Sequence, residues 1–521
     1  MAGRYADLAC FFRARNSRKA TRGGGAWGGD YASFDQAGPR NNFGRRLNLV
    51  RGGGGLIWLG LHYGFEFHER LIALVSPRSE DQVHPAPPRA DSGVTSRKVA
   101  PSIAQQSSPC NPVEARYGLI IDAGSSGSRI YIYCWKPGGD PANRGPWVTA
   151  ALGQQGKPLV FKFSTPLSDK SCESDAHNCL SRLIDDARQN IGNDPQITRV
   201  HLMATAGMRR KEVDYPKETK VTMDTAEAYL KKTFKSASTV TSTIITPEQE
   251  ALYGWIAVNY LMGFLKDKDG NSSPTMGILE LGGASTQIAY ASSDPSSQGL
   301  ATLPWGDTTY QIYRHSFDGL GQDKALDKIN YSYSNSSHSS MSKQRRPINP
   351  CYPIDYPIPG DDGLGAWNYG DGLGAGNYND CKNQIENTLL LSLPNDQQMD
   401  KQRRQPHGVF LAYAGYYYTY LFLSKVFEKP ILSLAELETA GSQYCSERWE
   451  KLDNREKLKS YIDEKYLPLW CFRAAYIAAL LQTGYGFPNA TQQIFTTDTI
   501  QGNEISWTLG AMVYEAGSKL P

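Results

Sequence analysis

The sequence predicts a duplicated α/β fold with two lobes. Strand-like and helix-like segments alternate from Tyr117 onward, which is typical of a mixed α/β domain. Two glycine-containing hairpins, at 119–133 and 276–290, repeat one design: a strand reaches an acidic residue, the chain turns through small residues, and a second strand follows. Such an internal repeat is what a duplicated fold with two phosphate-binding turns facing a shared cleft would produce. The 521 residues suffice for two or three domains.

The first hairpin has the composition of a turn that approaches an anionic group closely. An apolar strand reaches Asp122, and the chain then turns through glycines and serines before an alternating strand resumes at Ile130. Glycine permits backbone conformations that other residues avoid, serine hydroxyls and backbone N–H groups can bind anionic oxygens, and a carboxylate can hold a divalent cation or its waters. An ordinary surface hairpin is the alternative for this stretch taken alone.

Periodicity predicts further regular elements along the chain. Strands are expected at 158–163, 199–209 and 239–245, helices at 178–191, 225–235 and 246–261, a loop-rich segment at 294–394, helical apolar segments at 408–427 and 466–482, and a short final helix at 505–514. The strand at 199–209 runs into a second turn of small residues. A glycine-rich repeat, at 363–369 and again at 372–378, is interpreted as a surface insertion, with calcium binding as the alternative.

The charge distribution argues against nucleic acid as a partner. The net charge is only +3, and the positive excess is concentrated near the N-terminus. We interpret 1–115 as a disordered or non-native basic leader with a Pro/Ser-rich linker, and an arm that binds an anionic partner is the alternative. We identify neither a signal peptide nor a transmembrane anchor, because the apolar run at 55–65 is too short and too polar to span a bilayer.

The nine cysteines favour an oxidising compartment. None has the CxxC spacing of a zinc site, and the pairs closest in sequence would each close a short loop. Those pairs are Cys172/Cys179, Cys351/Cys381 and Cys445/Cys471. A secreted, periplasmic or lumenal location is therefore expected. The alternative is a set of buried thiols in a cytoplasmic enzyme.

Five segments, read together, resemble a known family. They are 122–129, 204–209, 246–255, 280–287 and 507–512. In this order and at these spacings they are similar to the apyrase conserved regions of the nucleoside triphosphate diphosphohydrolase family. That family belongs to the actin, Hsp70 and sugar kinase superfamily. The resemblance therefore implies the actin-like ATPase fold, in which two ribonuclease H-like lobes arise by duplication. The resemblance implies hydrolysis of terminal phosphates from ATP, ADP and other nucleoside tri- and diphosphates, with Ca²⁺ or Mg²⁺.

The resemblance and the chemistry of phosphoryl transfer together assign candidate roles, because this reaction mainly needs the phosphate held, its charge neutralised and a nucleophile placed in line. The candidate phosphate-binding residues are Ser125, Ser126, Ser128, Arg129, Thr205, Ala206, Gly207, Gly282, Gly283 and Ala284. Asp122 and Glu280 are the expected holders of a hydrated divalent ion. The family usually has aspartate at the position of Glu280, so this chain has one methylene more at that site.

Water is the expected nucleophile, and the resemblance assigns Glu250 as its general base with Ser285 and Gln287 orienting it. On the sequence alone, stabilising the start of its helix would be the favoured role of Glu250, and Glu248 is another candidate for that role. The resemblance also places Tyr418 and Trp470 as an aromatic pair that stacks the base, where composition alone favours packing in the core. It makes Cys445–Cys471 the most credible disulfide.

The resemblance also divides the chain. Lobe I is predicted to comprise 116–245 plus 497–521, and lobe II 246–496. The nearest alternative function is an exopolyphosphatase of the same superfamily, which needs no base-stacking pair. A nucleotide-switched binding protein of the actin kind is the alternative from a different class, and it would need a module that binds a partner.

Overall fold

The structure is a computed structural model. It describes residues 110, 115–135, 148–152, 158–173, 175–191, 196–265, 275–292, 300–305, 308–338, 348–359, 372–393, 399, 406, 408–459, 462–488 and 493–517. All of them belong to one compact unit, Glu66–Pro521. Of the predicted leader at 1–115, the structure describes only Cys110 and Ala115, and the first copy of the repeat, at 363–369, lies outside the described residues.

The first sheet is built on the first glycine hairpin. Its strand order is β3-β2-β1-β5-β6, and β4 also pairs with β2. The strands are β1 (Arg116–Gly124), β2 (Gly127–Trp135), β3 (Val148–Ala150), β4 (Val160–Phe163), β5 (Gln196–Ala204) and β6 (Thr239–Ile244). β1 and β2 are antiparallel, whereas β1, β5 and β6 are mutually parallel. β1 is buried along almost its whole length, because it is the central strand of the sheet.

The second sheet repeats this plan around the second hairpin. Its order is β15-β14-β7-β8-β10-β9, with β7 (Gly277–Leu281), β8 (Ser285–Ala291), β9 (Leu300–Trp305), β10 (Thr308–Asp318), β14 (Phe410–Ala414) and β15 (Ile494–Thr496). β7 and β8 form an antiparallel pair, and β14 and β15 continue parallel to β7. Each sheet thus consists of a hairpin, two further antiparallel strands on one side and two parallel strands on the other. The predicted duplicated α/β fold class is confirmed.

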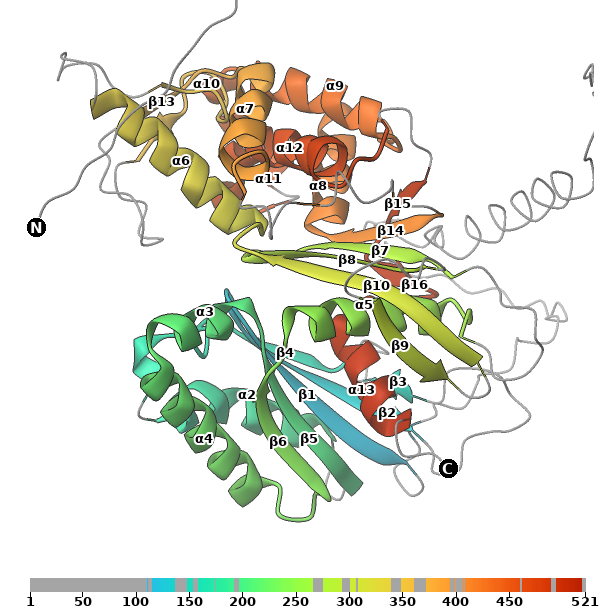
Figure 1. The fold of residues 1–521 in the computed structure, drawn as a ribbon. Helices are drawn as coiled ribbons and strands as arrows, with labels where there is room; N and C mark the ends of the chain where they lie inside the picture. Colours follow the sequence, from blue (N-terminus) through green and yellow to red (C-terminus); the bar gives the residue numbers. More distant parts are fainter. Residues whose placement is uncertain are drawn as a thin grey trace, which may run out of the picture. The chain divides into compact units, whose positions relative to one another are not determined.

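Helices cover both sheets (Figure 1). They are α2 (Ala176–Ile191), α3 (Ala206–Asp214), α4 (Pro216–Thr233), α5 (Pro247–Leu261), α6 (Gln322–His338), α7 (Tyr378–Ile385), α8 (Gly415–Phe427), α9 (Leu434–Cys445), α10 (Trp449–Asp453), α11 (Glu456–Lys459), α12 (Trp470–Ala479) and α13 (Trp507–Gly517). Two π-helical turns, Glu386–Leu390 and Leu480–Gly484, extend α7 and α12. Short strands β11 (Ile348–Asn349), β12 (Pro357–Ile358) and β13 (Gly372–Gly374) form a small sheet, and β16 (Thr499–Ile500) pairs with β17 (Asn503–Glu504).

Helices α5 and α13 connect the two sheets (Figure 1). α5 contacts β7, β8 and β10 as well as α13, and α13 contacts β1, β2 and β3. The two helices approach so closely that a Cβ placed on Gly510 would lie 1.8 Å from the carbonyl oxygen of Tyr253. Apolar residues occur on every face of α5, and from Glu250 to Leu261 each residue is buried. The helix that carries Glu250 is therefore held between the two sheets.

Three expectations for the regular elements were wrong. The small residues after β5 begin helix α3 instead of forming a turn, because Thr205 already has the extended conformation of an N-cap. The first part of 408–427 is strand β14, whose apolar run is buried between β7 and β15 and so lacks a diagnostic period. The segment 294–394, expected to be loop-rich, supplies two strands of the second sheet and helices α6 and α7.

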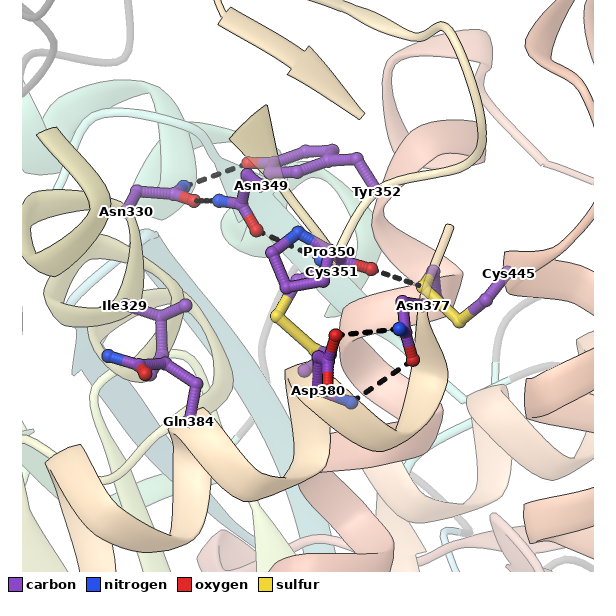
Figure 2. Close-up of a disulfide and its surroundings, with 12 residues drawn as sticks. Ile329, Asn330, Asn349, Pro350, Cys351, Tyr352, Asn377, Asp380, Gln384 and Cys445 are labelled. Carbon is purple, nitrogen blue, oxygen red and sulfur yellow. Dashed lines mark hydrogen bonds between the residues drawn. A yellow bond between two sulfur atoms is a disulfide. The ribbon is translucent and has the colours of Figure 1, made fainter. Parts of the chain in front are cut away.

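Disulfides join all three cysteine pairs named from the sequence, and a fourth joins Cys110 to Cys134. Two of them lie side by side near the start of α12 (Figure 2). The Cys471 Sγ of one disulfide is 3.6 Å from the carbonyl oxygen of Pro350, the neighbour of Cys351 in the other. A buried chain of hydrogen bonds from Asn349 through Asn330 to Tyr352 fixes the same turn. The N-terminus of α12 is thus cross-linked to its surroundings.

The partition into lobes at 116–245 plus 497–521 and at 246–496 stays a prediction. All strands of the first sheet fall within the first range, and all strands of the second sheet within the second. Among the helices that the structure describes, none combines the length and the apolar character needed to cross a membrane.

Candidate active site

The first glycine turn brings Ser125 and Ser126 to the end of a tight hairpin. Gly124 pairs with Gly127, so these two serines form the loop. Gly127 has φ +143°, and a Cβ there would lie 2.5 Å from the carbonyl oxygen of Phe163, which explains why glycine is required. Ser125 is half-buried and Ser126 is exposed. Both serines are therefore accessible to a ligand.

Ser128 and Arg129, on the returning strand, have different surroundings. Ser128 is fully buried, and its Oγ has no hydrogen-bond partner within the described part of the chain. Its hydroxyl is therefore not presented at the turn as Ser125 and Ser126 are. Arg129 places its Nη1 3.5 Å from Asp122 Oδ2, which is the residue directly opposite in the hairpin.

The N-terminus of α3 packs against the first turn at Ser125. A Cβ on Gly207 would lie 3.0 Å from Ser125 Cα, which is tighter than an ordinary Cβ contact and so favours glycine. Thr205 caps the helix without a side-chain hydrogen bond. The backbone N–H groups of Ala206 and Gly207 donate to no described residue. Free N–H groups at a helix N-terminus favour an anion.

The second glycine turn meets the first at the same serine. A Cβ on Gly283 would lie 3.7 Å from Ser125 Oγ. The turn is rigid, because the residues at and just before the start of α6 donate backbone hydrogen bonds of 2.7 to 3.2 Å to the carbonyls of Gly282, Gly283 and Ala284. The N–H groups of Gly283 and Ala284 donate to none of the described residues. Two turns and one helix terminus thus present backbone donors around Ser125.

Three acidic residues from different elements lie close enough to interact electrostatically: Asp122 on β1, Glu250 on α5 and Glu280 on β7. Burial raises the pKa of Asp122 to about 6, and Arg129 opposes this shift. Burial, together with the charges of Glu250 and Asp122, raises the pKa of Glu280 to about 8. Tyr413, opposite Glu280 in the neighbouring strand β14, donates a 3.0 Å hydrogen bond to Glu280 Oε2. The cations that act on these three acids are Arg129 and Arg209, so the cluster has more acidic than basic groups.

Glu250 does not stabilise the start of its own helix. That role belongs to a capping box in which Thr246 and Gln249 exchange hydrogen bonds of 2.8 and 3.1 Å. The Glu250 side chain is buried and accepts a 2.9 Å hydrogen bond on Oε2 from Arg209 Nη2. Burial raises the pKa of Glu250 to about 7, although Arg209 lowers it. Glu250 is therefore a carboxylate tuned toward neutral pH, as a general base requires.

Ser285 and Gln287 form one buried unit on β8. Gln287 Nε2 donates 2.8 Å hydrogen bonds to Ser285 Oγ and to Ser316 Oγ on β10. Gln287 lies opposite Glu280 in the hairpin and opposite Ser316 in the next strand. Because both amide hydrogens are engaged, the Gln287 carbonyl oxygen and the Ser285 hydroxyl hydrogen remain to bind another group.

The two predicted base-stacking residues differ in accessibility. Tyr418, on α8, is 53% exposed, so its ring is available to a ligand. Trp470 is 1% exposed. Its ring stacks on Phe422 with centroids 4.3 Å apart, and the guanidinium carbon of Arg473 lies 4.6 Å from its centroid. Trp470 can therefore accept a base only if one of these neighbours moves, and the stacking pair stays a prediction.

Four residues at this site were not identified from the sequence. Arg209 lies one turn into α3 and donates to Glu250, to Asp318 and to the carbonyl of Ile245. The other three are Asp318, Ser316 and Tyr413. The sequence signal for Arg209 was its place as the last residue of the second of the five segments, 204–209. The contacts of the other three depend on strand register, which no local pattern reveals.

Backbone donors gathered around one serine, beside buried acids of raised pKa, define a protein that binds and acts on phosphate groups. Comparison with known families agrees. A family model for the GDA1/CD39 (nucleoside phosphatase) family matches residues 109–519. The chain belongs to this family, so the resemblance read from its five segments is confirmed.

Two relatives and one solved structure illustrate the similarity. Ectonucleoside triphosphate diphosphohydrolase 3 of Homo sapiens is 29% identical over 447 residues, which cover 77% of this chain and 78% of the relative. Probable apyrase 6 of Arabidopsis thaliana is 30% identical, over 78% of this chain and 73% of the relative. The crystal structure of nucleoside triphosphate hydrolases from Neospora caninum matches with a TM-score of 0.55 at 16% identity, covering 77% of this chain and 92% of that one. This last match supports the fold.

Proposed function

We propose that the protein is an apyrase-type nucleoside triphosphate diphosphohydrolase, which cleaves terminal phosphates from nucleoside tri- and diphosphates to leave the monophosphate. The observation that carries the proposal is the meeting of both glycine turns and the α3 N-terminus at Ser125. The names of the relatives in the same family support the choice of nucleotides as substrates.

The terminal phosphate is held by the donors around Ser125. Backbone N–H groups of the two turns and of Ala206 and Gly207 bind its oxygens, and the hydroxyls of Ser125 and Ser126 add two donors from the first turn. These groups are fixed before substrate arrives, because the carbonyls of the second turn are already bonded to the start of α6. Rigid donors stabilise the charge of the transition state without reorganisation.

Water attacks the terminal phosphorus while the bond to the leaving phosphate oxygen breaks. Glu250 accepts the proton of this water. Its Oε2 is occupied by Arg209, so Oε1 is the oxygen that takes the proton. The Gln287 carbonyl oxygen accepts a hydrogen bond from the water, and the Ser285 hydroxyl donates one to it, since Gln287 already donates to Ser285 and Ser316. Positioned acid–base catalysis of this kind contributes about 10²–10⁴-fold.

A divalent cation, Ca²⁺ or Mg²⁺, fits between Asp122 and Glu280. Burial raises the pKa of both carboxyl groups, and the charge of Asp122 adds to the shift of Glu280, so a cation would relieve the cost of ionising them. Within the described ranges no three His, Cys, Asp or Glu side chains form a metal-binding group. The ion would thus take its other ligands from water and substrate, as Mg²⁺ commonly does. When bound, it neutralises phosphate charge.

The base-binding part of the site rests on Tyr418, whose exposed ring can stack on any base. The four disulfides support a secreted or lumenal location, because such bonds persist in oxidising compartments.

The test is phosphate release from ATP, ADP, GDP, UDP and inorganic polyphosphate, with Ca²⁺, Mg²⁺ or chelator. We expect nucleotide hydrolysis that needs a divalent ion and falls about 10²–10⁴-fold in Glu250→Gln. Glu248→Gln, on the same helical turn, is the matched control and keeps its activity. Full activity in chelator, or in Glu250→Gln, would contradict the mechanism. Preference for polyphosphate, with Tyr418→Ala unchanged on nucleotides, would favour the exopolyphosphatase alternative.

A further inference from the structure

Arg473 is a nearly buried cation without an anionic partner. It lies on the first turn of α12 and is 8% exposed. Its guanidinium carbon is 4.6 Å from the ring centroid of Trp470 and 5.1 Å from that of Tyr466. Within the described part of the chain it donates no hydrogen bond and forms no ion pair. In place of an anion, its guanidinium faces two aromatic rings.

This arrangement leaves a positive charge uncompensated. Cation–π contacts offset only part of the cost of removing a guanidinium from water. Buried charges in proteins are normally paired or hydrogen-bonded. Burial lowers the pKa of Arg473, and Asp323 is the acid whose charge opposes that shift. No ion pair joins the two side chains, so an anionic group from outside the protein would complete the environment of Arg473.

The position of Asp323 connects this cation with the second glycine turn. Asp323 is at the start of α6, where its N–H donates a 3.0 Å hydrogen bond to the carbonyl of Gly283. A Cβ on Gly283 would lie 2.6 Å from Asp323 Oδ2. Because Arg473 and Asp323 affect each other's pKa, the guanidinium lies within electrostatic reach of the turn proposed to hold phosphate.

The cation is also held in place before any ligand binds. Trp470 stacks on Phe422, and the next residue, Cys471, is disulfide-bonded to Cys445. The sulfur of Cys471 contacts the Pro350 carbonyl beside the second disulfide, as Figure 2 shows. A charged group fixed by this cross-linked turn loses little conformational entropy when it binds.

We propose that Arg473 is a substrate-binding residue that pairs with a phosphate group of the nucleotide, beyond the donors of the two glycine turns. This inference rests on the proposed function for its substrate. A phosphate is chosen over the base because a neutral base edge would leave the buried charge uncompensated, whereas a phosphate oxygen both neutralises it and accepts its N–H groups in parallel.

The test compares Arg473→Gln and Arg473→Lys with wild type. Arg448→Gln, which also removes one arginine charge but breaks an exposed ion pair with Asp355, is the matched control. We measure kcat and KM for ATP, GTP and UTP, binding of inorganic tripolyphosphate by calorimetry, and thermal unfolding. Arg473→Gln should raise KM about tenfold to a hundredfold, equally for the three nucleotides, with little change in kcat. Tripolyphosphate binding should weaken by the same factor, and Arg473→Lys should recover part of it.

Two results would overturn the proposal. A lowered unfolding temperature with unchanged KM and unchanged tripolyphosphate affinity would make Arg473 a packing residue only. If KM rose by different factors for the three nucleotides and the affinity for tripolyphosphate did not change, Arg473 would contact the base instead of a phosphate. Because tripolyphosphate binding needs no turnover, failure of the proposed hydrolytic function would show separately, as wild-type protein that binds phosphate chains without cleaving nucleotides.

Discussion

Arg209 donates to Glu250 and to Asp318 from the same guanidinium nitrogen, at 2.9 and 2.7 Å. Its Nε donates a further 2.8 Å hydrogen bond to the other oxygen of Asp318, so Asp318 holds the arginine in two-point contact while Glu250 receives one bond. Arg209 belongs to α3, beside the first sheet, whereas Asp318 ends β10 in the second. The ion pair therefore joins the two sheets at the position of the candidate base.

Asp318→Asn should move the acid limb of the pH profile of kcat/KM to lower pH. The negative charge of Asp318 raises the pKa of Glu250, and its two-point contact keeps Arg209 from pairing more fully with Glu250. Removing the charge of Asp318 and freeing Arg209 to pair with Glu250 both lower the pKa of Glu250. The base therefore stays ionised at lower pH. Burial raises the pKa of Glu250 to about 7, so we expect the wild-type midpoint near that pH and the variant's midpoint about one pH unit or less below it. Asp327→Asn is the control, because Asp327 forms an ion pair with Lys324 on α6. An unchanged midpoint in Asp318→Asn would contradict the proposed effect of Asp318 on Glu250.

The stability of the metal-free protein should fall as pH rises from about 4 to about 8. The pKa values of Asp122, Glu250 and Glu280 are raised in the folded state to about 6, 7 and 8. Folding therefore favours their protonated forms, and this stabilisation is complete at low pH and lost as each group ionises. Thermal unfolding in chelator and in excess Ca²⁺ measures the effect. The gain from Ca²⁺ should grow over the same pH range, and a gain independent of pH would count against a cation at these carboxylates.

Tyr413→Phe should weaken divalent-ion binding. The lost hydroxyl removes the hydrogen bond that stabilises ionised Glu280, so the pKa of that carboxyl rises further and fewer molecules carry the charged ligand at neutral pH. Hydrogen bonds to charged groups are worth about 1.5–3 kcal/mol, so a tenfold or larger loss of affinity is expected. Calorimetric titration with Ca²⁺ and Mg²⁺ tests it. Tyr378→Phe removes a buried hydroxyl that has no described partner, and it should leave affinity unchanged.

Removal of the Cys445–Cys471 disulfide should cost more stability than removal of Cys172–Cys179. The two bonds close loops with sequence separations of 26 and 7 residues. Since the entropy removed from the unfolded chain grows with the logarithm of loop length, the difference is expected to be about 1 kcal/mol. Urea unfolding of the two double Cys→Ser variants provides the measurement. Equal losses would indicate that strain or residual structure decides the effect.

The sequence predicted the architecture well where local signals were strong. The two glycine hairpins, the helix that begins after Thr246 and the cysteine pairs all followed from spacing and turn chemistry. It failed where tertiary burial decided the outcome. β14 lies between two strands and is apolar on both faces, so its sequence has no period of its own.

In the candidate site too, residues in local motifs were predicted from the sequence, whereas residues placed by tertiary contacts were not. Positions in the turns, such as Ser125 and Gly283, are carried by contiguous motifs and were identified directly. Ser128 was assigned with the other turn serines, but the alternation of the strand turns its side chain into the core. Tyr413 and Asp318 reach the site only through the pairing of β14 with β7 and of β10 with β8. Those pairings join segments far apart in the sequence, which no single stretch encodes.

The close contact between Gly510 and the backbone of Tyr253 has a consequence for protein synthesis. The first sheet and α5 precede the whole second sheet in the sequence, but part of the surface against which α5 packs comes from α13, which follows the second sheet. We therefore expect the Glu250 helix to find its final position only after α13 has left the ribosome. A chain that stops before α13 would bind no nucleotide productively, so hydrolysis would begin only once α13 is in place.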